Sequence, residues 1–335
     1  MKYVSLLISH LPKQISGRDE PIKQLKTAVS FLQTQDVILM TSAGQTHWDC
    51  ILTAALNYNI PTHLVIVKPM TISEVSEQFL CGFVKYDIVE SQEIRDKFIC
   101  VNSDFLYPLW LRSGGHLSQI ISEFSLQLDS RFDCSSYRFR NSGLKYLLSG
   151  VSDEISILPN NYLWHWTRSK HGMWPNETRR NYCNDILNSD SPPRDAISTL
   201  KRILIERNIH ASKLHIAANT PVTAFTANHP YKSELMFTWR KDCHQMNFEP
   251  YGIGIDIEYM IAKGTKKLEY GKYPNWDTMQ ADNRWKNENE WRYRGNFLLD
   301  NECLKKMIVV VRKHQEVEQI QKVFNGKIVV YEKNQ

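Results

Sequence analysis

Two acidic side chains near the C-terminal end have a type and spacing that suit catalysis. Glu288 and Glu290 stand two positions apart in the run NENEWR, residues 287–292. Side chains two positions apart in an extended strand point to one face of a sheet. Half-buried carboxylates cost free energy unless they bind a cationic or polarised group. The pair predicts a pocket for a ligand rich in hydroxyls and carrying positive charge, such as nicotinamide ribose. A solvated strand is the alternative.

A second polar motif lies in the run YLWHWTR, residues 162–168. Read as a strand, it places Leu163, His165 and Thr167 on one face and two tryptophans on the other. Seven of the nine tryptophans lie in the second half of the chain, a density typical of an aromatic-lined ligand pocket. The alternative for His165 is a histidine satisfied within the core.

Two glycine-containing turns predict a phosphate site. Gly44 and Thr46 follow an apolar strand and open a helix, and Gly114 and Gly115 precede the helical stretch 117–124. Glycine lets a backbone approach a ligand closely, and the N–H groups of a helix start attract anions. Ordinary turns between strand and helix are the alternative, because neither run matches a known phosphate-binding motif.

The first 130 residues alternate between apolar runs of strand length and amphipathic helical runs, which predicts a Rossmann-like parallel sheet of the α/β class. The expected strands are 3–9, 36–41, 62–67 and 97–101, and the expected helices are 20–33, 48–56 and 117–124. Open sheets of this class bind ligands at the carboxyl ends of their strands.

The second half has a different composition and predicts an α+β domain. Strands are expected at 162–167, 221–226, 251–257, 309–311 and 327–331, with a further strand at the glutamate motif and helices at 194–206 and 315–324. We therefore expect a domain at 1–130, a linker at 131–160 and a second domain at 161–335.

The composition of the chain limits the classes of protein to which it can belong. The chain has 335 residues, 42% hydrophobic residues and a net charge of +5, which suits two globular domains and permits a nucleotide or nucleic-acid partner. Its seven cysteines form no C-x-x-C, so neither a disulfide framework nor a metal site is expected. No apolar run reaches the roughly 18–20 residues that span a bilayer, and the start of the chain predicts a strand. We expect a cytoplasmic protein without a membrane contact, and a homo-oligomer stays open.

The N-terminal half resembles the lysine-decarboxylase-like, or SLOG, nucleotide-binding domains over about residues 1–130. The resemblance rests on Gly44 with Thr46, on Arg95-Asp96, and on the glycine pair 114–115 that opens a helix. It implies that the glycine pair holds a nucleotide phosphate. The usual GGxGTxxE of the group is here GGHLSQIISE, which lacks the third glycine and places Glu123 out of register. This departure favours nucleotide sensing over hydrolysis of a nucleotide N-glycosidic bond.

The C-terminal half resembles ADP-ribosyltransferase-like proteins and related bacterial phage-resistance families over about residues 160–300. Three motifs carry the resemblance in order: His165-Trp166-Thr167, then Ala224-Phe225-Thr226, then Glu290-Trp291-Arg292 with Glu288 before it. Trp166 and Ala224 depart from the Tyr or Phe and the Ser that are usual there.

This second resemblance implies NAD as the substrate. Glu290 would stabilise the oxocarbenium-like transition state, and Glu288 would face the incoming acceptor. Phe225 would pack on nicotinamide. The other predicted NAD-binding residues are His165, Thr167, Arg168, Thr226 and Arg292.

The sequence therefore predicts a two-domain effector, with a nucleotide-sensing N-terminal domain and a C-terminal ADP-ribosyltransferase or NAD glycohydrolase. The family resemblance implies a role in antiviral defence and a protein or nucleic-acid acceptor. Two alternatives remain: an N-terminal domain that cleaves a nucleotide N-glycosidic bond, and a non-catalytic sensing protein.

Overall fold

The computed structural model describes the whole chain apart from residues 13–14, 82–84, 140–149, 171, 192, 214–215, 217–218, 241–244, 272–274, 280–285 and 334–335. The chain forms two compact units that interleave along the sequence. Residues 1–141 and 171–193 form the first unit, and residues 142–170 and 194–335 form the second. The sequence predicted a single linker at 131–160, but the segment 171–193 returns to the first unit. Residues 140–149 of that linker lie outside the described residues.

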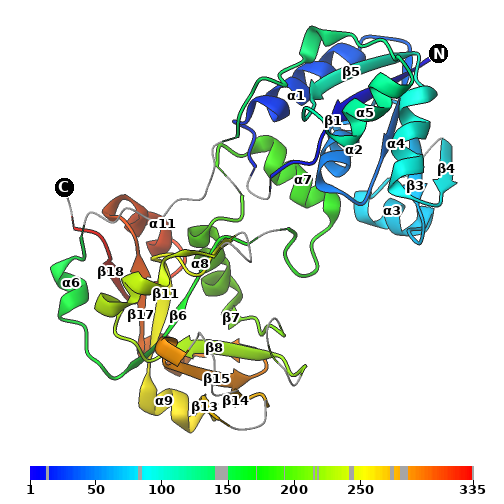
Figure 1. Cartoon of the computed structure of the whole chain (residues 1–335). Helices are drawn as coiled ribbons and strands as arrows, with labels where there is room; N and C mark the ends of the chain where they lie inside the picture. Colours follow the sequence, from blue (N-terminus) through cyan, green and yellow to red (C-terminus); the bar gives the residue numbers. More distant parts are fainter. Residues whose placement is uncertain are drawn as a thin grey trace. The chain divides into compact units, whose positions relative to one another are not determined.

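The first unit is built on a parallel five-stranded sheet in the order β4-β3-β2-β1-β5, as the alternating pattern predicted (Figure 1). The strands are β1 (Lys2–Ile8), β2 (Val37–Ser42), β3 (Thr62–Val67), β4 (Lys85–Val89) and β5 (Phe105–Trp110). The helices between and after them are α1 (Glu20–Leu32), α2 (Thr46–Asn57), α3 (Ile72–Phe79), α4 (Gln92–Val101) and α5 (His116–Glu123), and the 3-10 helix η1 (Ser130–Phe132) follows.

The strand order decides where the helices lie. The chain moves stepwise from β1 to β4, and α4 then carries it back across the sheet to β5. Because such crossovers are right-handed, α1, α2 and α3 cover one face and α4 covers the other, where it packs on α5. The N-termini of these helices therefore meet at the carboxyl edge of the sheet.

One element of this unit was predicted wrongly. Residues 97–101 were expected to form a strand, but they are the last part of α4, which begins after the capping residue Ser91. A five-residue apolar run does not distinguish a buried strand from a buried helical turn. The strand that completes the sheet is β5, which begins at Phe105.

The returning segment is anchored in the core of the first unit. Its helix α7 (Arg179–Asn188) buries Cys183, Ile186 and Leu187 in the hydrophobic cluster that also contains residues of α2. Figure 1 shows α7 beside α2. The segment is thus part of this unit's fold.

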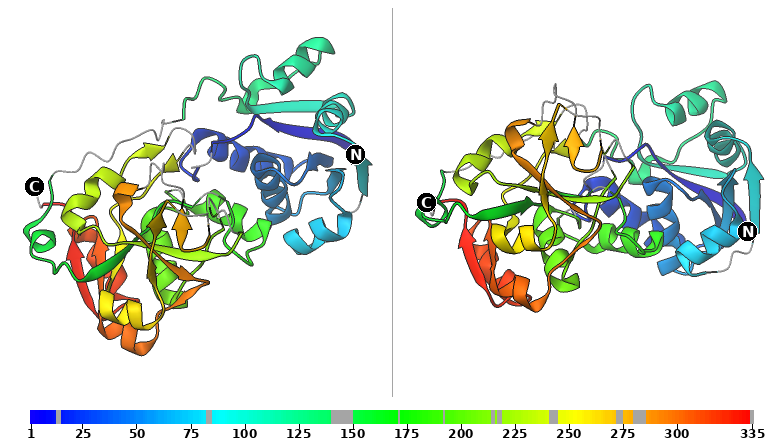
Figure 2. Two further views of the ribbon diagram at one scale, coloured as in Figure 1. Left: turned by 60° about the horizontal axis from the view of Figure 1, so that its bottom comes forward. Right: turned by 90° about the horizontal axis from the view of Figure 1, so that it is seen from below.

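The second unit is built on a mixed seven-stranded sheet in the order β12-β15-β8-β6-β11-β17-β18. Its strands are β6 (Tyr162–Trp166), β8 (Val222–Thr226), β11 (Gly252–Asp256), β12 (Lys266–Lys267), β15 (Glu290–Arg294), β17 (Met307–Val311) and β18 (Lys327–Val330). Figure 2 shows strands from distant parts of this sequence side by side, coloured from green to red.

Helices and short two-stranded pairs surround this sheet. The helices are α6 (Asp153–Ser156), α8 (Ala196–Glu206), α9 (Ile257–Ala262), α10 (Asn301–Lys305) and α11 (Val317–Gln321), with 3-10 helices η2 (Pro230–Met236), η3 (Lys286–Glu288) and η4 (His314–Glu316). The short pairs are β7 (Asn208–Ile209) with β16 (Phe297–Leu298), β9 (Trp239–Arg240) with β10 (Gln245–Met246), and β13 (Glu269–Tyr270) with β14 (Thr278–Met279).

Two glycines of β11 make room for the tryptophans of β6. Gly252 pairs with Trp166 and Gly254 with Trp164 in the antiparallel ladder. A Cβ atom at either glycine would lie 2.6 or 2.5 Å from the facing indole ring. The two indoles are stacked with ring centroids 5.8 Å apart. Because Gly252 and Gly254 have no side chains, the indole rings of β6 can lie against β11 on this face of the sheet.

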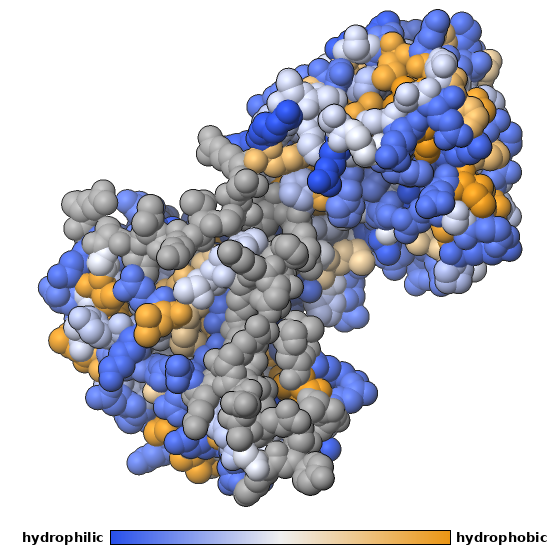
Figure 3. All heavy atoms as spheres, in the orientation of Figure 1, coloured by the Kyte–Doolittle hydropathy of each residue, from blue (hydrophilic) through white to orange (hydrophobic). Residues whose placement is uncertain are grey.

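The surface of the first unit is mostly hydrophilic in the view of Figure 3, with apolar residues between polar ones. Exposed apolar side chains include Tyr86 and Ile88 of β4 and Ile94 of α4.

Among the described residues, no helix has both the length and the apolar character that crossing a bilayer requires.

The position of α7 leads to a stability prediction. Ile186→Ala should destabilise the first unit by about 2–5 kcal/mol, because it opens a cavity at a side chain that is 1% exposed. Hydrogen exchange of α2 peptides under mild urea should report the loss. The control Ile94→Ala, at an exposed position, should change stability by less than about 0.5 kcal/mol. Faster exchange confined to the second unit would contradict the assignment of this segment.

Candidate functional site

A cavity of about 720 Å³ opens at the carboxyl ends of β2 and β3 in the first unit. Its volume lies within the roughly 300–1,000 Å³ of small-molecule sites. The loop after β2, the loop after β3, the first turns of α3 and α4, and residues 173–179 line it. Cations stand at Lys68, Arg95 and Arg179, and an apolar wall includes Met70 and Trp174. The cavity thus combines charged and flat apolar surfaces.

Gly44, one of the predicted phosphate-binding residues, lines this cavity. Its φ of +97° suits glycine, and a Cβ atom would lie 2.6 Å from Met70 Cε. Its N–H donates to Asp49 Oδ1 at 2.7 Å, and Asp49 Oδ2 pairs with Arg179 Nη1 at 2.8 Å. The turn is therefore tied to the returning segment through one buried carboxylate.

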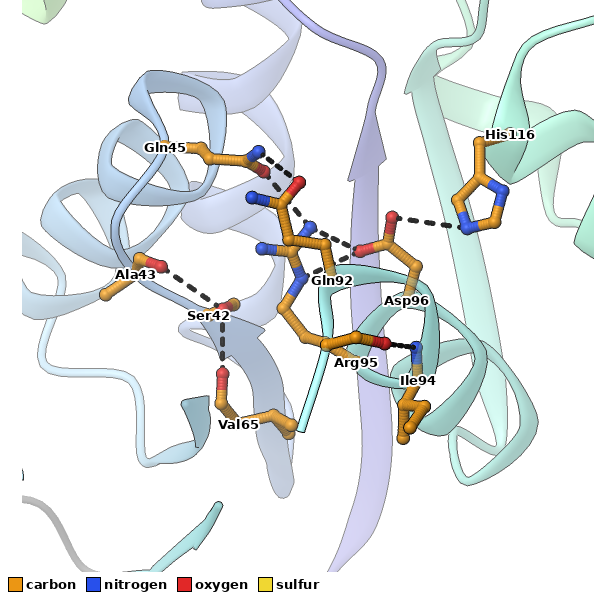
Figure 4. Close-up of polar contacts among 10 residues, drawn as sticks. Ser42, Ala43, Gln45, Val65, Gln92, Ile94, Arg95, Asp96 and His116 are labelled. Carbon is orange, nitrogen blue, oxygen red and sulfur yellow. Dashed lines mark hydrogen bonds and ion pairs between the residues drawn. The ribbon is translucent and has the colours of Figure 1, made fainter. Parts of the chain in front are cut away.

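A buried arginine organises the carboxyl edge (Figure 4). Arg95 is 2% exposed, and its Nε donates to Asp96 Oδ1 at 2.8 Å, while its Nη2 donates to Gln45 Oε1 at 3.0 Å. Gln45 Nε2 donates to Gln92 Oε1, and Asp96 Oδ2 lies 3.8 Å from His116 Nε2. Nη1 of Arg95 has no hydrogen-bond partner among the described residues. This buried cation lines the cavity with an available donor.

The N-terminus of α2 also offers donors at this edge. Thr71 and Ser91 cap α3 and α4 with side-chain hydrogen bonds, whereas the N-cap residue of α2, Gln45, makes no such bond. Its amide contacts Gln92 and Arg95 instead. The first N–H groups of a helix have no partners within the helix, and they attract anions together with the helix dipole.

Burial shifts the pKa values of the acids and the histidine at this edge. Burial raises the pKa of Asp49 against the opposing effect of Arg179, and burial likewise raises the pKa of Asp96 against that of Arg95. His47 is 6% exposed, and burial, with Arg95 and His10 nearby, lowers its pKa to about 3. His47 is therefore neutral at physiological pH.

The other predicted residues of the first unit lie at the same edge but outside the lining of the cavity. Thr46 is the first residue of α2, and Gly115 is the N-cap of α5. Gly114 has a φ of +68°. A Cβ atom at Gly115 would lie 2.9 Å from the carbonyl oxygen of Arg112, so the backbone itself requires glycine there. The Gln45–Arg95–Asp96–His116 contacts link the two glycine turns across the edge.

In the second unit, the three predicted motifs lie on three neighbouring strands. His165 is on β6, Phe225 on β8 and Glu290 on β15, and the sheet order places these strands side by side. Glu290 is 12% exposed, and its Oε1 accepts from Nε of Arg292 at 2.6 Å. Arg292 is 2% exposed and also donates from Nη1 to the carbonyl oxygen of Trp276. The ion pair holds the Glu290 carboxylate in place.

Glu288 does not share a strand face with Glu290, contrary to the prediction. Glu288 ends the 3-10 helix η3, and Asn289 has a φ of +47°, so β15 begins only at Glu290. The rule of alternate faces applies to continuous extended backbone and fails across this bend. Glu288 Oε1 accepts from Asn247 Nδ2 at 3.1 Å.

The register places His165 and Glu290 on opposite faces. Trp164 pairs with Thr226, and Thr226 with Glu290, so Glu290 shares a face with Trp164. His165 lies on the other face, where its ring contacts Phe225 at 5.7 Å between centroids. The strand alternation predicted for Leu163 and the tryptophans is confirmed, because they belong to different hydrophobic clusters.

The hydrogen bond of His165 determines what its other nitrogen can do. Nδ1 lies 2.9 Å from the carbonyl oxygen of Ala224, which only accepts, so Nδ1 carries the proton. Burial lowers the pKa of His165, and the neutral ring leaves Nε2 as an acceptor without a partner among the described residues. Such a nitrogen suits a ribose hydroxyl and not a phosphate.

The other predicted NAD-binding residues of the second unit make contacts within the protein. The buried Thr167 hydroxyl lies within hydrogen-bond distance of the carbonyl oxygens of Ala196 and Tyr251. The Thr226 hydroxyl donates to the carbonyl oxygen of Glu288. Phe225 is buried between His165 and Phe297, and Arg168 Nη1 is 3.5 Å from the carbonyl oxygen of Asn247. Their contacts with NAD stay predictions.

Sequence reasoning missed most cavity residues. Lys68 directly follows the buried strand 62–67, so the rule that selected Gly44 would also have selected it. Trp174 and Arg179 lie in the part of the sequence assigned to the second domain, and no local pattern places them at this edge. No group of three or more metal-ligating side chains occurs in the part of the chain that the structure describes.

Comparison of the sequence with models of known protein families found no match, and comparison with curated proteins found none either. Function is inferred from the geometry of each unit.

The burial of His47 predicts a pH-dependent stability. Because its folded pKa of about 3 lies below the usual 6.5, the unfolded chain takes up the proton first as pH falls, and stability is lost. Between pH 7 and 5, the His47 contribution should fall by about 2 kcal/mol. Urea unfolding read by pulsed hydrogen exchange in the first unit should show this loss, and His47→Gln should remove it. Equal pH dependence in His47→Gln and the wild type would refute it, and His116→Gln serves as control.

Proposed function

We propose that the first unit binds a nucleotide in the cavity at the carboxyl edge of its sheet, and that this binding is a sensing function. The observation that carries the proposal is Arg95, a buried cation that lines the cavity with one nitrogen unpaired by the described residues. A buried guanidinium favours a charged, multidentate oxygen ligand, and a phosphate group provides one.

Four further features support a phosphate beside Arg95. The uncapped N-terminus of α2 and the glycine turn at Gly44 adjoin the same cavity. Lys68 adds a second, exposed cation, which pairs with Glu90 at 2.6 Å. The site also lies where open α/β sheets bind their ligands.

The binding test removes the ion pair as a whole, so that no unpaired charge stays buried. Arg95→Gln combined with Asp96→Asn should weaken the binding of phosphate-bearing nucleotides about 10–100-fold, because it removes a charge-assisted hydrogen bond. Titration calorimetry of the full chain with nucleoside mono- and diphosphates measures it.

The matched control is Arg131→Gln with Asp129→Asn, a pair in the same unit and outside the cavity, and it should leave affinity unchanged. If the unmodified chain binds no member of the panel, nucleotide sensing by this unit is refuted.

We propose, as a second function, that the second unit uses NAD as a substrate, either transferring ADP-ribose or releasing it to water. The support is the position of the three motifs on β6, β8 and β15, with the Glu290 carboxylate held rigidly by Arg292. A fixed carboxylate stabilises positive charge that develops on a ribose in the transition state. His165 lies on the opposite face of the sheet from Glu290 and adds no support to this proposal.

Glu290→Gln should lower nicotinamide release by about 10²–10³-fold, with a much smaller change in NAD affinity, because the charge acts mainly in the transition state. The substitution also leaves the buried Arg292 without its charged partner, so stability must be measured in parallel. Glu332→Gln is the matched control: it breaks the Arg312–Glu332 pair at 2.7 Å in the same unit and should leave turnover unchanged.

Assays with NAD labelled on the adenine side separate hydrolysis from transfer to a macromolecule. If Glu332→Gln reduces turnover as much as Glu290→Gln, the effect of Glu290 is one of stability. If the wild-type protein releases no nicotinamide, the second function is refuted.

A further inference from the structure

The chain leaves the second unit after Lys170 and re-enters it at Arg194, and these two residues lie next to each other. The N–H of Lys170 donates to the carbonyl oxygen of Arg194 at 2.8 Å, so the residues that flank the segment are hydrogen-bonded to each other. Everything between them belongs to the first unit. The segment is therefore a closed loop of the second unit's chain whose body folds with the first unit.

The point of departure is tied to the strand that carries His165. The Thr167 hydroxyl lies 2.9 Å from the carbonyl oxygen of Ala196, and the Thr199 hydroxyl lies 3.1 Å from the carbonyl oxygen of Arg168. Residues 167–170, which follow β6, are thus fastened to the first turn of α8. The base of the loop is therefore connected to the end of β6 by these hydrogen bonds.

The body of the loop contributes one wall of the nucleotide cavity. Residues of the range 173–179 line it, including Trp174 and Arg179. Arg179 pairs with Asp49, which accepts the N–H of Gly44 through its other oxygen. A continuous set of contacts therefore runs from the phosphate-binding turn to the loop.

The two parts of the loop differ in burial. Helix α7 is anchored by Cys183, Ile186 and Leu187 in the core, whereas residues 173–178 before it have no buried side chains. A ligand that contacts residues 173–179 can restrict their motion, and such ordering can couple sites energetically.

We propose that the loop 171–193 senses the nucleotide: Trp174 and Arg179 contact the bound ligand, and occupancy of the cavity is transmitted through the Lys170–Arg194 bond to the strand that carries His165. The proposal rests on the proposed nucleotide binding of the first unit and assigns the regulation of that site. The ligand class is a nucleotide whose phosphate lies at Arg95 and whose flat base lies against Trp174.

Hydrogen exchange of the full chain tests the transmission. The probe is the member of the nucleoside mono- and diphosphate panel with the highest affinity in calorimetry. Its binding should slow exchange at 43–48 and 173–179, and also slow it by about threefold or more at 162–170 and 194–200, which lie in the other unit. Slowing at the first two regions alone overturns the transmission but leaves nucleotide binding established.

Two variants test the contact. Trp174→Ala should weaken nucleotide binding about 5–100-fold, the range for a lost base–aromatic contact, and should abolish the slowing at 162–170. Arg18→Ala is the control, because it breaks only the exposed pair with Asp190 of the same loop and should change neither measurement. Unchanged affinity in Trp174→Ala overturns the contact, and absence of binding by the whole panel overturns both this proposal and nucleotide sensing.

Discussion

The carboxyl edge of the first sheet depends on the burial of one guanidinium group. A buried charge is tolerated only when it is paired and hydrogen-bonded, and Arg95 obtains this from Asp96 and Gln45. Gln45 is also the N-cap residue of α2, and its side chain makes no capping hydrogen bond. Arg95 thus lines the cavity with one guanidinium nitrogen that has no hydrogen-bond partner among the described residues, and the N-cap residue of α2 lines the same cavity.

A second buried arginine has a comparable effect in the other unit. Arg292 holds the carboxylate of Glu290 against a strand, and this immobility is what an electrostatic catalyst requires. In the proposed NAD reaction, stability and activity would therefore depend on the same pair of charges. The bend at Asn289 removes Glu288 from the strand, so the two glutamates do not act as a pair on one face.

The two units alternate along the sequence, so one stretch of chain is connected to both of them. After the strand that carries His165, the span 171–193 contributes to the wall of the cavity in the first unit before the chain returns to the second unit. Coupling between a ligand site and a second unit needs an element whose state both can bias, and in the proposed regulation that element is this loop. The domain boundary predicted from composition does not reveal this alternation. Composition changes near residue 130, and not where the chain passes from one unit to the other at residues 170–171 and 193–194.

Local sequence patterns predicted about half of the strands and helices and the position of the glycine turns. Periodicity and turn chemistry act over a few residues, so β2, β3, α2 and β6 could be predicted from them. The short apolar run 97–101 was misread because its helical state depends on packing. Only the tertiary structure brought Arg179 and Trp174 to Gly44, set the opposite faces of His165 and Glu290, and buried Arg95. These features arise from strand register and burial, which depend on contacts between residues far apart in the chain. Such contacts leave no local pattern in the sequence.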